Sequence, residues 1–478
     1  MCRSLLLLLS LAACAMATNP AIKAVLTDKG LKFGTKVGTE WLQAQILKAQ
    51  IPDMSGDVSL SILGSVHYTL SRMGVARLNM PLPSVVFSEG TGVQVDLTGF
   101  NMAVKGQWNT RYLFIRDGGT FRLGMFNVGV SLQLQVGSDE NGHLSVSSVQ
   151  CRSSIGAMDI LFHGGASWVL QQFVTQFKHQ IQSQVQEKIC PTFEGGIQRL
   201  ESHLAAMNVS IPLYRVLLLD MPLTSSPAIQ ASDLSLDFKG EFYSAQCPKE
   251  PPFVSEKFQL PPQERFMLTL GVSEFCLNSA AFAFMSTGQL QINITDKMIP
   301  PHFPIHLNTS SFGQFVPQLP KLYPNMLMLF YVYASSTPLV SFLPDNATLL
   351  LSASAKAYAI KPNSSALIPL FRLDLSANIG GKFFVEDMTL KGSLMLNNFT
   401  LTLGASEVGT FSTLPLQKVL NVGITTMALP WLNAKLKHGL PIPAIKNVNL
   451  SNTVLKVNKG FVAIATDAAV SALEEGQL

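Results

Sequence analysis

Residues 126–136 read FNVGVSLQLQV, and this stretch decides the fold class. Apolar side chains stand at every second position from Phe126 to Val136, and mostly polar residues or glycine stand between them. A period of two is typical of a half-buried strand. The same alternation recurs at residues 234–238, 290–294, 390–396 and 399–403. Asn397-Asn398 marks an irregularity or a turn between the last two. The sequence therefore predicts twisted antiparallel sheets with one solvated face.

Three stretches place apolar residues at helical spacing instead. Thr27-Asp28 can cap the first helix, whose apolar face comprises Phe33, Val37, Trp41 or Leu42, and Ile46. The second is expected from Trp168 to Lys188, with its stripe at Val169, Phe173, Phe177, Ile181 and Val185. The third is expected from about Leu416 to Lys437, and Pro430 should kink or divide it.

The chain divides into segments of different composition. Arg3, an apolar run from Leu5 to Ala13 and the small residues Ala15 and Ala17 are typical of a secretory signal that is cleaved after residue 17, and the alternative is an uncleaved anchor. Prolines at 248–262 indicate an extended linker with little freedom. The expected segments are a signal (1–17), a first domain (18–243), a linker (244–265), a second domain of like architecture (266–470) and a disordered tail (471–478).

The composition is more apolar than is usual for a secreted chain. Hydrophobic residues make up 47%, charged residues 13%, and mean hydropathy is +0.28, whereas soluble domains average about 25% charged residues. The excess must line an unusually large core, an interface or a lipid cavity. Residues 18–246 are neutral and residues 247–478 carry only +3, so nucleic acid is a poor candidate partner.

Cysteines and sequons agree with secretion. Cys151, Cys190, Cys247 and Cys276 remain after the signal is removed, which indicates two disulfides and leaves three pairings open. Asn-x-Ser/Thr sequons predict glycosylation at Asn208, Asn293, Asn308, Asn346, Asn363, Asn398 and Asn449.

The sequence contains none of the nucleophile-elbow, zinc-protease, phosphate-loop or Cys-x-x-Cys motifs. His302 and His306 are four residues apart, but Pro301 and Pro304 argue against a helix, so the spacing is a poor metal signal. We expect no catalytic residues, no metal and no enzyme cofactor.

Several motifs, in order, resemble one known family. They are Asn19-Pro20, residues 27–31, Ile51-Pro52-Asp53, Gly106-Gln107-Trp108, residues 239–243, Pro251-Pro252-Phe253, and residues 296–300, 322–326 and 439–443. Together, over roughly residues 19–467, the chain resembles the bactericidal/permeability-increasing and lipopolysaccharide-binding protein family. Each motif alone is weak, and the order and spacing carry the resemblance.

The resemblance implies an α+β fold. The expected form is an elongated boomerang of two similar antiparallel barrel-plus-helix domains, joined by a central β-sheet, each with an apolar pocket that holds a bound phospholipid. Pocket candidates are Trp41, Leu42, Ile46, Val169, Phe173 and Phe177. The alternative is that these residues are ordinary core, as most such stripes are.

The resemblance also selects a disulfide, since Cys151 and Cys190 occupy the family's positions around the second helix. Cys247 and Cys276 lie outside that pattern. They either form a second bridge or are two unpaired, buried thiols.

Family members bind lipid A phosphates through basic residues at the tip of the first domain. The matching residues here are Lys105, Arg111 and Arg116, with Lys48 near the other tip segment. Gln107, Asn109, Tyr112 and Leu113 replace basic residues of the most basic members, and the three cations are alternatively a solvated strand face.

The resemblance implies a secreted, monomeric innate-immune protein that binds lipopolysaccharide. Its action would be antibacterial or lipopolysaccharide-presenting, and its partners would be lipopolysaccharide, phospholipids, the bacterial outer-membrane surface and host receptor proteins. The alternatives are a general phospholipid or neutral-lipid carrier, and a scaffold that has kept the fold without lipid traffic.

Overall fold

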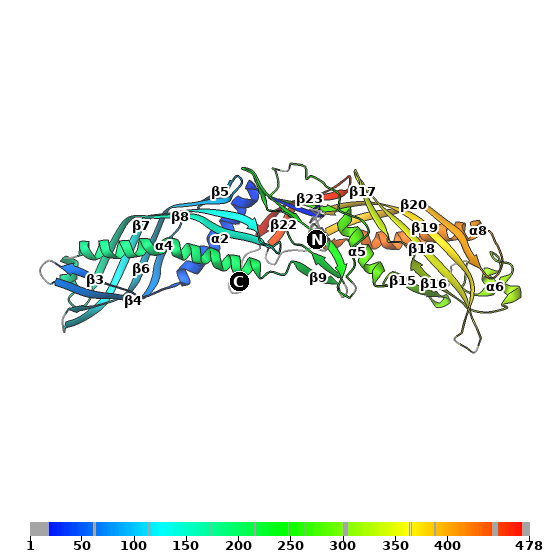
Figure 1. Cartoon of the computed structure of the whole chain (residues 1–478), viewed down its shortest axis with the longest axis horizontal. Helices are drawn as coiled ribbons and strands as arrows, with labels where there is room; N and C mark the ends of the chain where they lie inside the picture. The colour runs from blue at the N-terminus through cyan, green and yellow to red at the C-terminus, as the bar shows by residue number, and fades with distance from the viewer. Residues whose placement is uncertain are drawn as a thin grey trace, which may run out of the picture.

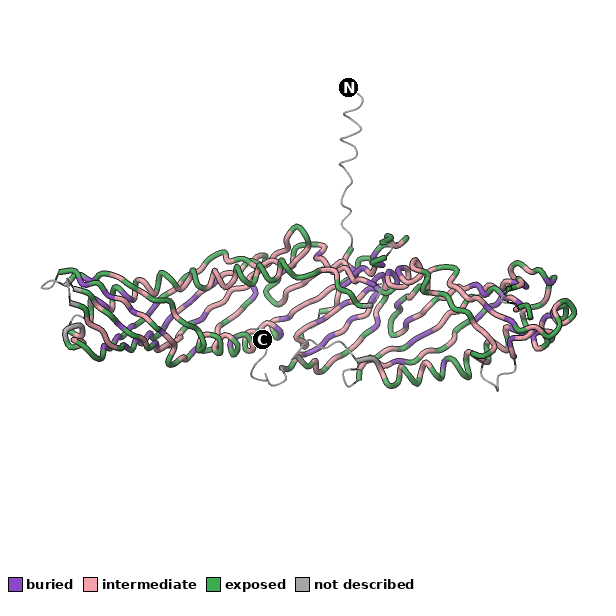
Figure 2. Tube along the Cα trace, turned by 90° about the horizontal axis from the view of Figure 1, so that it is seen from below, coloured by how far each residue is buried: buried purple, intermediate pink, exposed green. Residues whose placement is uncertain are grey.

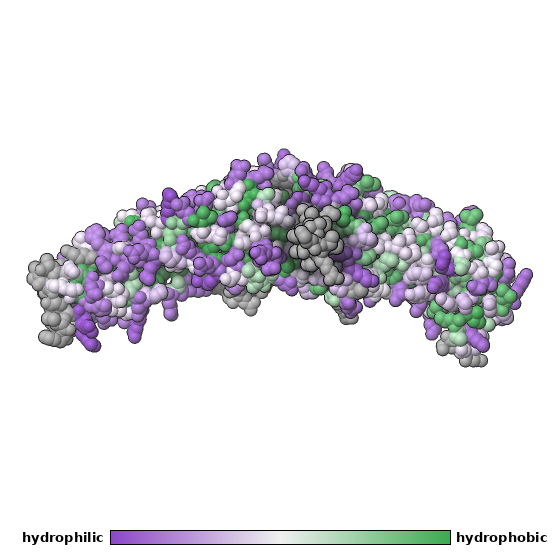
Figure 3. Space-filling model, in the orientation of Figure 1, coloured by the Kyte–Doolittle hydropathy of each residue, from purple (hydrophilic) through white to green (hydrophobic). Residues whose placement is uncertain are grey.

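The computed structural model describes residues 19–60, 64–112, 115–172, 174–214, 217–246, 248–262, 264–299, 305–362, 364, 366–386, 389–441 and 448–470. The molecule is elongated and curved, with a helix-backed sheet at each end and a smaller sheet between them (Figures 1 and 3). The predicted signal and tail lie outside the described residues. Among those residues, no helix is both long and apolar enough to cross a bilayer.

The first large sheet has seven strands. They are β2 (Gln50–Ile51), β3 (Met54–Leu60), β4 (Gly64–Asn79), β5 (Ser84–Ser88), β6 (Gly92–Tyr112), β7 (Ile115–Ser138) and β8 (Leu144–His163). Its order is β2-β4-β6-β7-β8, with β3 on β4 and β5 on β6, and every pairing is antiparallel. Buried residues alternate with more exposed ones along parts of these strands, for example β4 and β8, as the period of two predicts; Figure 2 colours the trace by residue burial.

One position breaks the predicted alternation. Val128, Val130 and Leu132 are buried as expected, but Phe126 is 45% exposed. The reason is a bulge at Asn127, which has a positive φ of 52° and donates its backbone N–H to the Asn101 side-chain oxygen. One extra residue reverses which face the neighbouring side chains take. The placement of Phe126 on the inner face was therefore wrong.

Two helices pack on the first sheet. Helix α2 (Asp28–Lys48) begins as predicted, because the Thr27 hydroxyl accepts the Gly30 N–H. After α3 (Ser167–Gln172), α4 (Val174–Ala205) continues past the predicted end at Lys188 and includes Pro191. The apolar stripe of α4 continues beyond Lys188 through Ile189, Phe193 and Ile197.

The second large sheet repeats the plan. Its strands are β15 (Gln291–Thr295), β16 (Met328–Ala334), β17 (Leu339–Leu343), β18 (Asn346–Ile360), β19 (Leu367–Glu386), β20 (Thr389–Ser406) and β21 (Leu440–Pro441). The order is β15-β16-β18-β19-β20-β21, with β17 on β18. Asn397-Asn398 lies at a register shift inside the continuous strand β20, so the irregularity is a bulge and not a turn.

The helical segment on the second sheet is divided. It consists of α8 (Leu414–Gly423), a π-helical turn η2 (Ile424–Ala428) and α9 (Leu429–His438). Pro430 lies in the first turn of α9, directly after the π-helical turn. The predicted break near Pro430 is confirmed. Short helices α6 (Thr309–Phe312) and α7 (Leu319–Leu322) lie at the far end.

A six-stranded central sheet joins the two halves. Its order is β11 (Ala228–Ile229), β12 (Asp233–Phe238), β1 (Ile22–Thr27), β14 (Leu268–Ser273), β23 (Phe461–Val470) and β22 (Val448–Asn458). Strand β1 therefore pairs with β14 across the boundary between the halves. A three-stranded sheet of β9 (Ser210–Tyr214), β10 (Leu217–Asp220) and β13 (Glu241–Ser244) and the helix α5 (Glu274–Ser286) lie nearby.

Residues 248–262 form no helix or strand and run along the central sheet. Ser255 donates its hydroxyl to the Pro20 carbonyl at 3.1 Å, and Phe258 stacks on Phe461 with ring centroids 4.7 Å apart. These contacts hold the proline-rich segment against the sheet.

Candidate functional site

Strands β6 and β7 form the long hairpin that carries the predicted basic tip. Arg111 is directly opposite Arg116, and Lys105 is directly opposite Arg122. Directly opposite residues of an antiparallel pair share one face. Trp108 and Phe121 point to the other face and are 1% exposed, so all four cations lie on the solvent face, where each is exposed.

The four cations make two pairs that lie about 20 Å apart, since six residues separate Lys105 from Arg111 and each strand residue rises ~3.3 Å. Within the described part of the chain, no carboxylate lies within ion-pair distance of any of them. Like charges directly opposite each other destabilise a strand pair. The hairpin therefore presents positive charge that has no carboxylate partner among the residues that the structure describes.

Nearby acids are already engaged. His67, which is opposite Arg111 on β4, has its Nδ1 3.1 Å from Asp57 Oδ1. Asp117, next to Arg116, accepts the backbone N–H groups of Gly118 and Ala166. These contacts hold the carboxylates of Asp57 and Asp117 to other groups.

Lys48 does not join the end of the hairpin. It is exposed in the last turn of α2, two residues before Gln50. Gln50 pairs with Gly74 of β4, and Gly74 pairs on its other side with Lys105. The structure therefore brings Lys105 to Arg122 and Arg111 to Arg116, and leaves Lys48 on the other side of β4.

Two residues at this end were missed from the sequence. Arg122 completes the Lys105 pair, and its position follows from the register of the hairpin, in which Tyr112 pairs with Ile115. Trp168 is 68% exposed at the start of α3. The hydrogen bond from the Ala166 N–H to the Asp117 side chain ties the start of this helix to the end of β7. Asp117 follows Arg116 directly in the strand, so its side chain points to the face opposite the cations. The face of this end visible in Figure 3 is largely hydrophilic.

The pocket candidates separate into four groups, of which Phe177 alone is the last. Leu42 and Ile46 join a cluster that contains Met80, Leu97, Val130 and Leu132 as buried members. Trp41 is 45% exposed. The side chains of Val169 and Phe173 lie outside the described residues.

Phe177 belongs to the main core of the first domain. It is 1% exposed, and its ring makes edge contacts with Tyr68 and Phe162, with centroids 5.7 and 5.6 Å apart. For this residue the structure supports the core interpretation.

The cluster around Leu42 and Ile46 is where α2, α4 and the sheet meet. Its partly buried members are mostly apolar, and the disulfide is at its edge: Leu42, Ile46, Val95, Phe100, Cys151, Ile189, Phe193 and Ile197. Gln43 Nε2 donates to the Met80 carbonyl at 2.8 Å and fixes α2 on the sheet. Two cavities of about 590 and 640 Å³ are lined mainly by polar residues, and neither contains a pocket candidate.

Cys151 and Cys190 form the disulfide, with Cα atoms 5.7 Å apart, and it ties β8 to α4. Cys276 is instead a free thiol, 3% exposed, in α5. The prediction that Cys276 forms a second disulfide is therefore wrong. Its side chain is enclosed among apolar neighbours such as Phe275 and Ile22. Burial raises the pKa of the Cys276 thiol to about 12. Cys247 lies outside the described residues.

The predicted glycosylation positions differ in exposure. Asn208, Asn293, Asn398 and Asn449 are exposed, Asn346 is half-buried, and Asn363 lies outside the described residues. Asn308 uses its side-chain oxygen to cap α6 through the Ser311 N–H at 2.7 Å.

The part of the chain that the structure describes contains no group of three or more His, Cys, Asp or Glu side chains suited to a metal ion. His306 has its Nδ1 3.3 Å from Asp296 Oδ1, and His302 lies outside the described residues.

Known proteins match this chain over nearly its whole length. Residues 30–200 match the N-terminal domain of the LBP / BPI / CETP family, and residues 213–470 match its C-terminal domain. The chain belongs to the LBP / BPI / CETP family. Members of the LBP / BPI / CETP family are not enzymes, so membership assigns the chain no catalytic role.

Individual relatives agree. The bactericidal permeability-increasing protein of Sebastes schlegelii is 36% identical over 97% of this chain and 98% of its own. The lipopolysaccharide-binding protein of Homo sapiens is 28% identical over 95% and 94%. The crystal structure of a lipopolysaccharide-binding protein superposes with a TM-score of 0.58 at 27% identity and covers 95% of this chain and 99% of that one. The predicted two-domain α+β arrangement of the LBP / BPI / CETP family is confirmed.

Proposed function

We propose that the chain is a secreted innate-immune protein that binds the lipid A portion of lipopolysaccharide through the β6–β7 hairpin. The observation that carries the proposal is the set of four exposed cations, Lys105, Arg111, Arg116 and Arg122, paired across the strands with no carboxylate partner among the described residues. The names of two relatives, a lipopolysaccharide-binding protein and a bactericidal permeability-increasing protein, support it.

The physical argument begins with the repulsion inside each cation pair. A phosphate bound between Arg111 and Arg116 replaces that repulsion with charge-assisted hydrogen bonds, and arginine can hold it with two parallel bonds. The Lys105–Arg122 pair offers a second anionic position about 20 Å away along the hairpin. Two separated positions suit an amphiphile that displays more than one phosphate, or neighbouring molecules in an anionic layer.

Trp168 would supply an apolar contact at the same end of the sheet, on the face that carries α3. An exposed indole suits the boundary between headgroups and acyl chains, because its ring is apolar and its N–H can be hydrogen-bonded. The acyl chains themselves would enter a pocket in each domain, formed where a sheet closes toward its long helix. In the first domain we place that pocket at the cluster of Leu42, Ile46 and Phe193, which is only partly buried.

The action that follows binding is antibacterial or lipopolysaccharide-presenting, and host receptor proteins are the partners in the second case. The proposal takes the chain to be a monomer that acts outside the cell at the bacterial outer-membrane surface. The Cys151–Cys190 disulfide is consistent with an oxidising compartment.

A general carrier of phospholipid or neutral lipid is the second candidate. It is favoured by the neutral charge of residues 18–246 and by the apolar cluster between α2 and α4. In that case the cluster would bind lipid and the hairpin cations would be a solvated face.

The test is a titration of the glycosylated protein with lipid A vesicles and with phosphatidylcholine vesicles. The hairpin variant replaces Lys105, Arg111, Arg116 and Arg122 with Ala. Its control replaces Lys361, Lys418, Lys437 and Lys459, exposed lysines of the second half, so that the net charge changes equally. We expect the hairpin variant to lose on the order of a thousandfold in affinity for lipid A at low salt.

If both variants lose the same affinity for lipid A, the loss comes from the lower net charge and not from the hairpin. Tight phosphatidylcholine binding that neither variant changes, without preference for lipid A, would support the carrier instead.

A further inference from the structure

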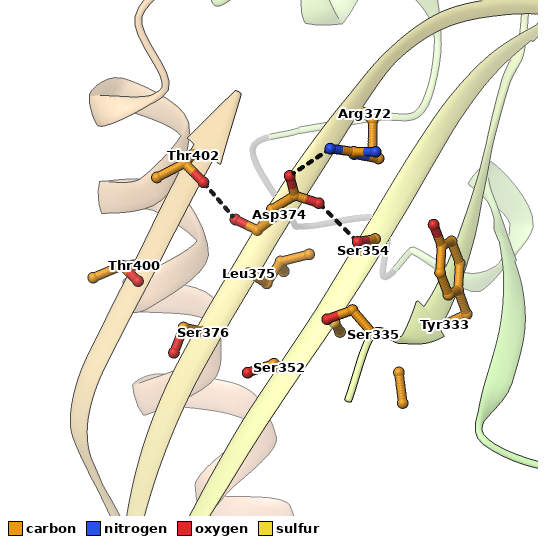
Figure 4. A pocket seen from close by; sticks show the side chains of 12 residues that line it. Tyr333, Ser335, Ser352, Ser354, Arg372, Asp374, Leu375, Ser376, Thr400 and Thr402 are labelled. Carbon is orange, nitrogen blue, oxygen red and sulfur yellow. Dashed lines mark hydrogen bonds and ion pairs between the residues drawn. The ribbon is translucent and has the colours of Figure 1, made fainter. Parts of the chain in front are cut away.

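The solvent face of the second large sheet has a groove of about 590 Å³ (Figure 4). It crosses β16, β18, β19 and β20. One row of cross-strand neighbours consists of Tyr333, Ser354, Asp374 and Thr402. On the same strands, Leu373, Phe399 and Leu401 point the other way and are buried in the core. The groove is therefore the outer face and not part of the core.

The next row consists of hydroxyl side chains. Ser352, Ser376 and Thr400 are neighbours across three strands, and Ser335 follows on the edge of the groove. Hydroxyls both donate and accept hydrogen bonds. Two adjacent rows therefore offer a dense set of groups that can adapt to a ligand with many hydroxyls.

One end of the groove contains a fixed ion pair. Arg372 Nη2 lies 3.1 Å from Asp374 Oδ2, and the Ser354 hydroxyl donates to Asp374 Oδ1 at 2.7 Å. The guanidinium lies across Gly404, where a Cβ would be 2.7 Å from Arg372 Nε. That Nε is buried and has no hydrogen-bond partner among the described residues. The Arg372 side chain as a whole is 42% exposed, so its terminal N–H groups can donate to a ligand oxygen in the groove.

One aromatic ring, that of Tyr333, lines the groove. Tyr331 and Tyr333 stack with centroids 5.3 Å apart, and Lys356 Nζ lies 5.5 Å above the Tyr333 ring. The groove thus combines hydroxyls, one ion pair and an aromatic face. Acyl chains are excluded by the polar lining, and a simple polyanion is disfavoured by Asp374. A saccharide matches all three elements, because its hydroxyls pair with polar groups and its C–H face packs on a ring.

We propose that this groove binds a saccharide chain. One source is the chain itself. Asn398-Phe399-Thr400 is a sequon whose Thr400 lines the groove, and Asn398 is exposed two residues away on the same face, opposite Asn378. A glycan on Asn398 would leave the protein at the edge of the groove. The other source is an oligosaccharide from solution.

The test compares glycan release and saccharide binding in the secreted full-length protein. The groove variant is Arg372→Gln with Ser376→Ala, which keeps the Asn398 sequon. Asn208, an exposed sequon in the first half, is the internal control. In the native protein, a glycosidase should release the Asn398 glycan at least tenfold more slowly than the Asn208 glycan, and the groove variant should abolish that difference.

The second arm uses Asn398→Gln, which empties the groove of any attached glycan. Its probes are the oligosaccharide released from the protein and the delipidated core oligosaccharide of lipopolysaccharide. Binding of either probe that falls at least tenfold when Arg372→Gln and Ser376→Ala are added supports the groove and assigns the source. Equal release rates at Asn208 and Asn398, together with no groove-dependent binding of either probe, would overturn the proposal. If Asn398 carries no glycan, the second arm alone decides.

Discussion

Replacing Phe177 with Ala tests whether this residue is core or pocket lining. Its side chain is 1% exposed and contacts the rings of Tyr68 and Phe162. Truncating a buried phenylalanine costs about 3–5 kcal/mol, and each lost edge contact adds about 0.5–1.5 kcal/mol to what area alone predicts. We therefore expect the free energy of unfolding of the first domain to fall by about 4 kcal/mol.

The assay is denaturant unfolding of the mature protein, followed by the fluorescence of Trp108, whose ring contacts Phe162. The matched control is Phe126→Ala, because Phe126 is 45% exposed at the bulge and should cost less than about 1 kcal/mol. A loss below about 1 kcal/mol for Phe177→Ala, accompanied by weaker phospholipid binding, would refute the core assignment and place Phe177 in a lipid pocket.

Three further outcomes follow from the structure. Asp467 accepts hydrogen bonds from Lys29, Asn452 and the Met267 N–H, and although burial opposes it, these bonds lower the pKa of Asp467. Asp467→Asn should therefore lower the free energy of unfolding by about 1–3 kcal/mol at neutral pH, measured by chemical denaturation. The difference from wild type should disappear as pH falls through the lowered pKa of Asp467. A difference that grows in acid would contradict this. Cys276, with its raised pKa of about 12, should resist maleimide at pH 8 until the protein unfolds, and rapid native labelling at this residue would show that the thiol is accessible. Changing both Cys151 and Cys190 to Ser opens a loop of 39 residues and should cost about 4 kcal/mol in thermal unfolding, and an unchanged midpoint would argue against the bridge.

The sequence predicted the parts of the fold that depend on local pattern. The alternation at residues 128–132 and the helix that begins at Thr27 follow from side-chain periodicity and capping. The Cys151–Cys190 bridge came from resemblance alone. The bulge at Asn127 could not be predicted, because the alternation in the sequence continues through it while the backbone does not.

Long-range pairing limited what could be predicted of the site. Arg111 and Arg116 are close in sequence and were found together, whereas Arg122 is 17 residues from Lys105 and becomes its neighbour only through the hairpin register. Trp168 was seen only as the start of a helix, and the Ala166–Asp117 hydrogen bond places it at the tip. The insertion of β1 between β12 and β14 likewise joins segments more than 200 residues apart, which no local pattern indicates.

The most direct test of the central claim is the affinity for lipid A of Arg122→Glu, measured beside Lys361→Glu. Both reverse one exposed charge, but only Arg122 belongs to the hairpin. The account predicts at least a tenfold loss for Arg122→Glu at low salt, a smaller loss at high salt, and little change for Lys361→Glu. Equal affinity of the two variants for lipid A would contradict the hairpin as the binding surface.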